Sequence, residues 1–333
     1  MQVRNFLFDR GIIKSASFPV PVIGIGNLST GGTGKTPHVE YLIRLLQKEY
    51  KIATLSRGYG RHTKGFLLLK PPANTWMYGD EPMQYFTKFP GVRVSVGEDR
   101  TAAIEELMRL NPKIEIILMD DAFQHRSIKA GLNILLTEYN NLFTRDFYLP
   151  TGDLRDLKSN YKRAEIIVVT KCKSDLSEAE RQKVIKEISP VAGQQIFFTA
   201  IEYGQLYHIV HKRVFAPDAK TEILLVTGIA NPRPLKKMLE EHSNSYHMLQ
   251  YTDHHIFTID DLNEIKKRFE HIETANKIIL TTEKDAVRLA KFNNEITGLP
   301  LYVIPVRHQF LFGDGERFDQ LVMDFIQNFK QQS

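Results

Sequence analysis

The sequence predicts an α/β fold, with a doubly wound parallel sheet followed by a second, smaller α/β domain. Three observations lead to this prediction: a glycine-rich segment at residues 26–36, short apolar runs that recur over residues 1–200, and similar runs after residue 222. Short runs rich in Val and Ile, without clean alternation, are typical of strands that are buried on both faces of a parallel sheet.

The glycine-rich segment reads GNLSTGGTGKT and lies between the apolar run 19–25 and a helix-like run that begins at His38. A strand, a glycine-rich loop and a helix N-terminus in this order are typical of the P-loop NTPase fold, which binds a nucleoside triphosphate and Mg²⁺. The usual pattern has glycine at position 29, where this chain has Ser29. The predicted nucleotide-binding residues are Ser29, Thr30, Gly31, Gly32, Thr33, Gly34, Lys35 and Thr36.

The apolar runs set the expected domain organisation. In the first part they are 19–25, 52–55, 92–96, 114–119, 132–136 and 166–169, with helix-like segments between them. We expect a P-loop domain at 1–200 that includes a short amphipathic N-terminal segment, a two-stranded connector at 201–222, and a smaller α/β lid domain at 223–333.

Composition narrows the function classes. The chain has 333 residues, 42% of them hydrophobic and 25% charged, which is typical of a globular protein. Cys172 is the single cysteine, so an internal disulfide is excluded and the cytoplasm is favoured. The formal net charge of +5 suggests an anionic partner but does not identify it.

The N-terminal segment 1–18 interleaves apolar residues with Arg4, Arg10 and Lys14. It could form a short helix on an anionic bilayer or an ordinary helix packed on the core. No run is long and apolar enough to span a membrane, and no signal-peptide pattern is found, so we expect no transmembrane segment.

Two acidic motifs are candidates for chemistry. Asp120 and Asp121 follow an apolar strand, where a carboxylate of a P-loop protein can hold Mg²⁺. His125 could reach the same site or cap a turn. Gly79-Asp-Glu-Pro precedes a helix-like run, so Asp80 could be either a helix cap or a base that accepts a hydroxyl proton.

Further candidates lie on loops. Adjacent His254 and His255 must point in different directions, and His254 could bridge to a carboxylate of the other domain. Without a third clustered ligand, zinc is not expected. Arg57 and Arg155 follow or flank glycine-bearing loops that could bind an anionic group of the substrate.

In their order along the chain, these segments resemble the motifs of the tetraacyldisaccharide 4′-kinase family, the lipid A 4′-kinases of Gram-negative bacteria. The motifs are GNLSTGGTGKTP, SRGYGR, GDEP, DDAFQHR, LPTGDLRD, GIANPRP, TDHH and TEKDAVR. The resemblance spans residues 20 to about 290, and GDEP, DDAFQH, DH and TEKDAV in this order are specific to the family.

The resemblance implies that ATP, with Mg²⁺, phosphorylates the 4′-hydroxyl of a tetraacyldisaccharide 1-phosphate lipid to give lipid IVA. It implies Asp80 as the base, assisted by His254. Members of the family also have Ser or Thr at the position of Ser29. The Mg²⁺ ligand candidates are Thr36, Asp121, Asp120 and Glu81, and the substrate-binding candidates are Arg57, Arg155 and His125.

The resemblance further implies peripheral contact with the cytoplasmic face of the inner membrane. Family members usually begin with a longer apolar segment than residues 1–18 provide here. We therefore expect either a trimmed start or weaker anchoring, helped by the basic residues of this segment.

A P-loop is also compatible with two other functions, both of them nucleotide-gated switches acting on a protein or nucleic-acid partner. A dimeric switch would carry a lysine at position 30, where this chain has Thr30. A nucleic-acid-dependent ATPase would need basic patches with aromatic residues, which a net charge of +5 spread along the chain supports poorly. We therefore expect no nucleic-acid partner.

Overall fold

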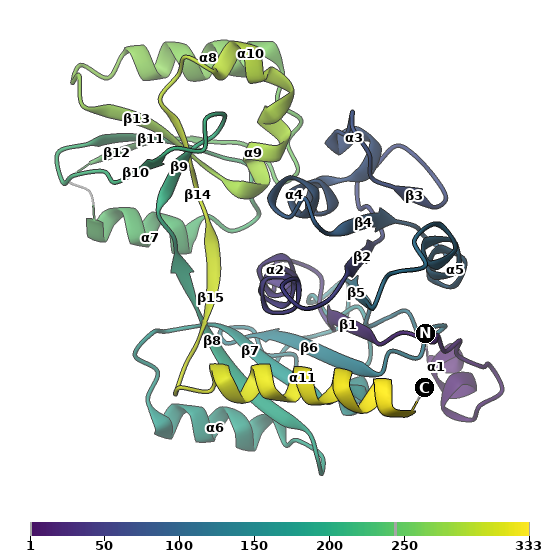
Figure 1. Ribbon diagram of the computed structural model, residues 1–333. Coiled ribbons are helices and arrows are strands. Elements are labelled where there is room, and N and C mark those ends of the chain that lie inside the picture. Colours follow the sequence, from purple (N-terminus) through teal and green to yellow (C-terminus); the bar gives the residue numbers. More distant parts are fainter. Residues whose placement is uncertain (1, 243–244, 333) are drawn as a thin grey trace.

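Among the described residues, the larger of two sheets contains nine strands, eight of them from residues 22–203 (Figure 1). The computed structural model describes residues 2–242 and 245–332. The strand order is β15-β8-β7-β6-β1-β5-β2-β4-β3, parallel except for edge strands β3 and β15. The bounds are β1 (Val22–Asn27), β2 (Ile52–Ser56), β3 (Leu67–Leu68), β4 (Arg93–Val96), β5 (Ile116–Asp120), β6 (Leu132–Glu138), β7 (Ile166–Cys172), β8 (Gln195–Tyr203) and β15 (Val306–Phe310).

Helices cover both faces of this sheet, because successive strand residues point to opposite sides. Ile116 and Leu118 of β5 pack in one core with α2 (Lys35–Leu46), α4 (Asp80–Lys88) and α11 (Gly315–Gln332). Ile117 and Met119 pack on the opposite face with α5 (Arg100–Leu110). Helix α6 (Glu178–Ile188) covers the neighbouring strands β6 and β7. The doubly wound arrangement predicted from the buried runs is confirmed.

The second sheet has six strands in the order β10-β9-β14-β13-β11-β12. Its strands are β9 (Leu206–His208), β10 (Val214–Phe215), β11 (Glu222–Thr227), β12 (Tyr246–Gln250), β13 (Lys277–Thr282) and β14 (Leu301–Ile304). Its helices are α7 (Arg233–His242), α8 (Ile259–Glu270), α9 (Glu283–Leu289) and α10 (Asn293–Ile296), with the 3₁₀ helix η2 (Ala290–Phe292) after α9.

The expected domain limits need one correction. The range 223–333 is not a single lid unit, because β15 pairs antiparallel with β8 and α11 packs on the first sheet. The sequence Leu301-YVIPV reads as one strand, but it contains β14 and the first residue of β15, with Pro305 between the two sheets. The connector 201–222 contains two strands as expected, β9 and β10, which pair with each other and extend the second sheet through β14.

The chain crosses between the sheets twice, from β8 to β9 and from β14 to β15, and the two crossings lie side by side (Figure 1). At the crossing, Gly204 N–H donates to the carbonyl of Pro305 at 2.9 Å. The remaining elements are α1 (Gln2–Asp9), α3 (Thr75–Tyr78) and the 3₁₀ helix η1 (Lys158–Arg163). Among the described residues, no helix has the length and apolar character required to cross a membrane.

Candidate active site

The glycine-rich loop joins β1 to α2 at the carboxyl edge of the first sheet, as predicted. Gly34 has φ of 88° and immediately precedes α2. A Cβ at this position would lie 2.9 Å from Nε2 of His308, so both the backbone conformation and the space require glycine. The Lys35 ammonium lies 3.3 Å from Oδ1 of Asn27 and 3.4 Å from Oδ1 of Asp121.

Ser29 and Thr30 attach the loop to the segment 146–155. Ser29 is buried and its hydroxyl donates to Oδ2 of Asp146 at 3.3 Å. The backbone N–H of Thr30 donates to the carbonyl of Asp153 at 2.7 Å, and its hydroxyl donates to Oδ1 of the same residue at 3.3 Å. The serine in place of glycine therefore has a structural partner of its own.

Asp120 ends β5 and has an incompletely paired carboxylate. Its Oδ2 accepts hydrogen bonds from Tyr85 at 3.1 Å and from Ser56 at 3.4 Å. Its buried Oδ1 has no hydrogen-bond partner among the described residues. Burial, together with the charges of Asp121 and Glu81, raises the pKa of Asp120 to about 6. A buried oxygen without a partner is a costly feature that a bound cation would relieve.

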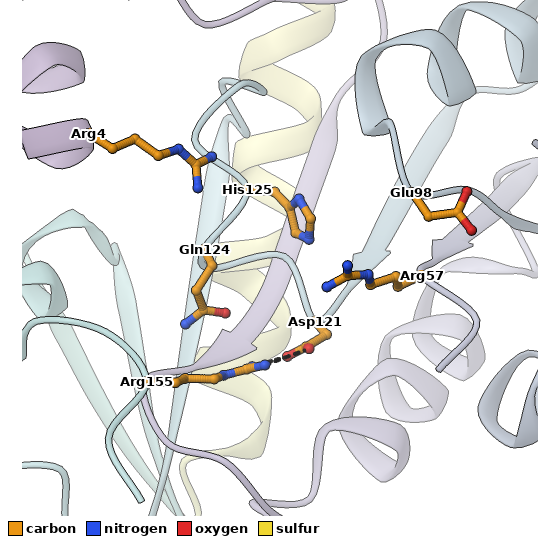
Figure 2. A pocket seen from close by; sticks show the side chains of 7 residues that line it. All are labelled: Arg4, Arg57, Glu98, Asp121, Gln124, His125 and Arg155. Atoms are coloured by element: carbon orange, nitrogen blue, oxygen red, sulfur yellow. Dashed lines mark hydrogen bonds and ion pairs between the residues drawn. The ribbon is translucent and has the colours of Figure 1, made fainter. Parts of the chain in front are cut away.

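Asp121 is fully engaged by cations. Arg155 contacts both of its carboxylate oxygens, donating to Oδ2 at 2.9 Å (Figure 2). Lys35 approaches Oδ1 at 3.4 Å. Burial alone would raise the pKa of Asp121, but the hydrogen bond from Arg155 and the charge of Lys35 hold it well below the usual range. Asp121 therefore contacts two cations, whereas Asp120 has one oxygen without a partner among the described residues.

A cavity of about 410 Å³ opens beside Asp121, and Figure 2 shows the side chains around it. All three predicted substrate-binding residues, Arg57, Arg155 and His125, line it. Burial and the charge of nearby Arg100 lower the pKa of His125 to about 4, so His125 is neutral at pH 7. The other lining residues are Arg4, Glu98, Asp121 and Gln124, of which the sequence had not suggested Arg4, Glu98 or Gln124 for this site.

Asp80 lies where α4 of the first sheet meets α9 of the second. Gly79, not Asp80, is the cap of α4, and Asp80 is the first helical residue. Gly79 has φ of 89°, and a Cβ there would lie 2.8 Å from the carbonyl oxygen of Tyr59. The carboxylate of Asp80 is 2.9 Å from Nδ1 of His254, which comes from the second sheet, while His255 turns away to Asp261 at 3.0 Å.

Arg288, which the sequence did not indicate for this site, also holds Asp80. Arg288 of α9 donates to Oδ2 of Asp80 from Nη2 at 2.6 Å and from Nε at 3.0 Å. Burial would raise the pKa of Asp80, but the hydrogen bonds from His254 and Arg288 outweigh it and lower the pKa to about 2. The segment TEKDAVR contains Arg288, but its spacing alone does not indicate which residue the arginine meets.

A sequence profile described as Tetraacyldisaccharide-1-P 4′-kinase matches residues 1–327. The chain belongs to this kinase family. The "Tetraacyldisaccharide 4′-kinase" of Flavobacterium psychrophilum is 45% identical over 330 residues, covering 98% of this chain and 93% of the relative. That of Bacteroides fragilis is 42% identical, covering 97% of this chain and 89% of the relative.

A crystal structure of LpxK from Aquifex aeolicus in complex with ATP has the same fold, with a TM-score of 0.74 and 26% identity over 98% of this chain and 94% of that one. As a member of the 4′-kinase family, the chain is a phosphotransferase of lipid A biosynthesis, and the family resemblance drawn from its motifs is confirmed.

Within this kinase the predicted site residues form two adjoining groups. Lys35 contacts Asp121 directly, and Asp120 meets Tyr85 of α4, the helix that begins with Asp80 and Glu81. The P-loop and the Asp80–His254 pair are therefore linked through α4.

Proposed function

We propose that this protein transfers the γ-phosphate of ATP to the 4′-hydroxyl of a tetraacyldisaccharide 1-phosphate lipid, giving lipid IVA and ADP. The observation that carries the proposal is the 2.9 Å contact between Asp80 and His254. It joins α4 of the first sheet to the loop after β12 of the second, and α4 also contacts Asp120 beside the P-loop. A P-loop supports many activities, but a buried carboxylate held in this way suits proton removal from an acceptor hydroxyl.

In this proposal the P-loop residues bind the triphosphate. The backbone N–H groups of residues 31–35 and the Lys35 ammonium would hold the β- and γ-phosphates, since the loop precedes the N-terminus of α2. Lys35 and Arg155 now share Asp121, so both cations are already gathered where the phosphates would lie. Asp121 would then serve mainly to place these cations.

Mg²⁺ would be held by Asp120 and Thr36, with Glu81 nearby. The unpartnered Oδ1 of Asp120 fits this role, whereas Asp121 is occupied by cations. The described residues contain no cluster of three or more His, Cys, Asp or Glu side chains suited to a metal. That agrees with Mg²⁺, which usually takes few protein ligands and completes its shell with phosphates and water. When bound, it neutralises charge on the transferred phosphate.

Asp80 would accept the proton of the 4′-hydroxyl, with His254 beside it. Phosphoryl transfer passes through a loose transition state, so the hydroxyl needs orientation and a late proton acceptor more than a strong base. Because His254 comes from the second sheet, the pair is complete only when the two sheets are docked.

The lipid would approach through the cavity beside Asp121. Arg57 and Arg155 give it a positive lining, suited to the phosphate of the disaccharide, and neutral His125 can offer a hydrogen bond without adding charge. Helix α1 borders the cavity through Arg4, and Asn5 donates to Asp156 at 3.2 Å, next to Arg155. The lining residues therefore come from segments distant in sequence.

We also propose peripheral contact with the cytoplasmic face of the inner membrane. Several large apolar side chains of α1, of the turn that follows it and of the segment 147–149 are exposed. They are Val3, Phe6, Ile12, Phe147, Tyr148 and Leu149. Apolar side chains beside Arg4 and Arg10 are typical of a surface that rests on an anionic bilayer. Failure of the protein to co-sediment with anionic vesicles would remove this proposal.

The direct test is to incubate the protein with ATP, Mg²⁺ and tetraacyldisaccharide 1-phosphate and to measure the lipid by mass spectrometry. We expect the mass of one added phosphate, located on the 4′-oxygen by fragmentation. Lys35→Met should abolish the product, whereas Lys48→Met, an exposed lysine just after α2, should not. ATP hydrolysis without a lipid product, especially if polynucleotide stimulates it, would favour the switch function instead.

A further inference from the structure

Helix α9 presents two cations to the Asp80–His254 pair. Lys284 and Arg288 are four residues apart, so they lie on the same face of the helix. Arg288 donates twice to Oδ2 of Asp80, and the Lys284 ammonium lies 3.1 Å from Nε2 of His254. Each cation thus meets a different member of the pair.

The guanidinium of Arg288 is itself fixed within the second sheet. Its Nη1 donates to Oδ1 of Asp285 at 2.9 Å and to the carbonyl of Gly228 at 3.0 Å. Asp285 is fully buried, and its other oxygen accepts from the hydroxyls of Thr227 and Thr282. The position of Arg288 is therefore set by its own sheet, independently of Asp80.

The contact with Lys284 determines the tautomer of His254. An ammonium group can only donate, so Nε2 of His254 must accept. Nδ1 then carries the proton and donates it to Oδ2 of Asp80 at 2.9 Å. In this arrangement Nε2 cannot take up a further proton unless Lys284 moves away.

We propose that Lys284 and Arg288 are positioning residues for the phosphate transfer: Arg288 fixes Oδ2 of Asp80 and leaves Oδ1 for the acceptor hydroxyl, while Lys284 holds His254 as the Nδ1–H tautomer. His254 then orients Asp80 and does not relay its proton. The inference rests on the proposed function and adds the two residues that align its base.

The electrostatics agree with this arrangement. The charged and titratable groups that face Asp80 are His254, Arg288 and Lys284, and against the opposing effect of burial they lower its pKa to about 2. His254 faces Asp80, Lys284, Asp253 and the ring of Tyr59. A carboxylate with so low a pKa is a weak base but is always ionised, which a loose transition state tolerates if its orientation is fixed.

The first test measures the pH dependence of turnover in Arg288→Met. We expect kcat to fall roughly 10²-fold with little change in KM for ATP. The acid limb of the kcat profile should also move up by about one pH unit or more, because Asp80 loses a cation. In Arg288→Ala, added guanidinium should restore at least about tenfold of the activity. Arg317→Met, which removes an arginine on α11 paired with Asp314, is the matched control and should leave the profile unchanged.

A lower kcat with an unmoved acid limb and no guanidinium rescue would overturn the role of Arg288. If Arg288→Met does not fold, Arg288→Lys provides the same test, since it keeps the charge but offers a single donor group. It should show a smaller loss of kcat and a smaller displacement of the limb.

The second test needs no activity. A ¹⁵N NMR spectrum of the histidine rings, with His254 identified by its loss in His254→Gln, should show the Nδ1–H form in the wild type. Lys284→Met should produce a mixture of tautomers, and the control Lys237→Met, which changes an exposed side chain of α7, should not. An Nε2–H form in the wild type would overturn the inference. Absence of a phosphorylated lipid would contradict the proposed function alone, because the tautomer is measured separately.

Discussion

Asp80 at the junction of the sheets and Asp120 at the end of β5 are both nearly excluded from solvent, at 8% and 5% exposure. Burial raises the pKa of a carboxyl group, and it does so at both positions. Yet the pKa of Asp80 falls to about 2, whereas that of Asp120 rises to about 6. The difference lies in what each carboxylate meets.

At the junction, α9 brings Arg288 and the loop after β12 brings His254 to the carboxylate of Asp80 at the start of α4. At β5, the carboxylate of Asp120 accepts hydrogen bonds from the neutral hydroxyls of Tyr85 and Ser56, next to a second aspartate, and the charge of Lys35 offsets only part of the effect of burial. The protein therefore surrounds one carboxylate with its own cations and compensates the other only in part. The lowered pKa of Asp80 suits a base that must stay ionised, and the partly unpaired carboxylate of Asp120 suits a ligand for a cation.

The largest expected effect comes from Asp80→Asn. We predict that kcat for lipid phosphorylation falls roughly 10³-fold, since the amide cannot accept the proton. The variant should also be less stable than the wild type at pH 7, because buried Arg288 would lose one of its two anionic partners and keep only Asp285. The pKa of Asp80 is lowered from 3.8, so its stabilising effect is present above about pH 4 and is lost as the pH falls toward 2.

Lipid phosphorylation and urea unfolding together test this prediction. Asp319→Asn is the control, because Asp319 is also partly buried and accepts a hydrogen bond from Tyr41 at 2.8 Å, in the core of α2 and α11. Near-normal turnover of Asp80→Asn at saturating ATP and lipid would show that Asp80 is not the base.

Asp120→Asn should show the opposite change in stability. Because the folded pKa of Asp120 is raised from 3.8 to about 6, its ionisation costs stability as the pH rises through this range, by up to about 3 kcal/mol above it. Without Mg²⁺ at pH 8, the variant should therefore melt at a higher temperature than the wild type. Its kcat should fall at least about 10²-fold.

Thermal melting with and without Mg²⁺ checks the proposed ligand. Millimolar Mg²⁺ with ATP should raise the Tm of the wild type more than that of Asp120→Asn. Equal stabilisation of both proteins would place the metal elsewhere, and Thr36 and Glu81 would then be the candidates to vary next.

The sequence predicted the parts of this site that lie within one short segment. The P-loop, the Asp120–Asp121 pair and the GDEP segment each follow a strand or precede a helix, and such local patterns can be read directly. The opposite pKa shifts of Asp80 and Asp120 could not be predicted, because they depend on which side chains meet across the fold. Arg288 is 208 positions from Asp80, and no spacing rule connects them.

The fold likewise could be predicted where it depends on local patterns, but not where it depends on contacts between distant segments. The buried parallel strands of the first sheet were predicted from their apolar runs, but β15 and α11 were assigned to the lid. A single proline after the apolar run Leu301–Ile304 does not indicate that the chain changes sheets there. The edge strands β3 and β10 are two residues long and have no periodicity to detect.

The smallest effect on turnover is expected from Lys88, a further cation between α4 and α9. Its ammonium lies 2.5 Å from Glu40 of α2 and 2.5 Å from Glu283 of α9, and both glutamates are buried. Lys88→Met should lower the free energy of unfolding by about 3 kcal/mol at pH 8, because two buried carboxylates lose their shared cation. Turnover should fall less than about tenfold, since Arg288 still docks on Asp80.

The loss of stability in Lys88→Met should shrink at pH 5. Burial and the charge of Glu40 raise the pKa of Glu283, so a proton can replace the missing cation as the pH falls. Urea unfolding at both pH values, with exposed Lys48→Met as the control, measures this difference. A loss of equal size at pH 5 and pH 8 would mean that packing of the Lys88 side chain, and not its charge, stabilises this part of the junction. The pairs Asp80–Arg288 and Glu81–Lys284 would then be the contacts that join α4 and α9 by charge.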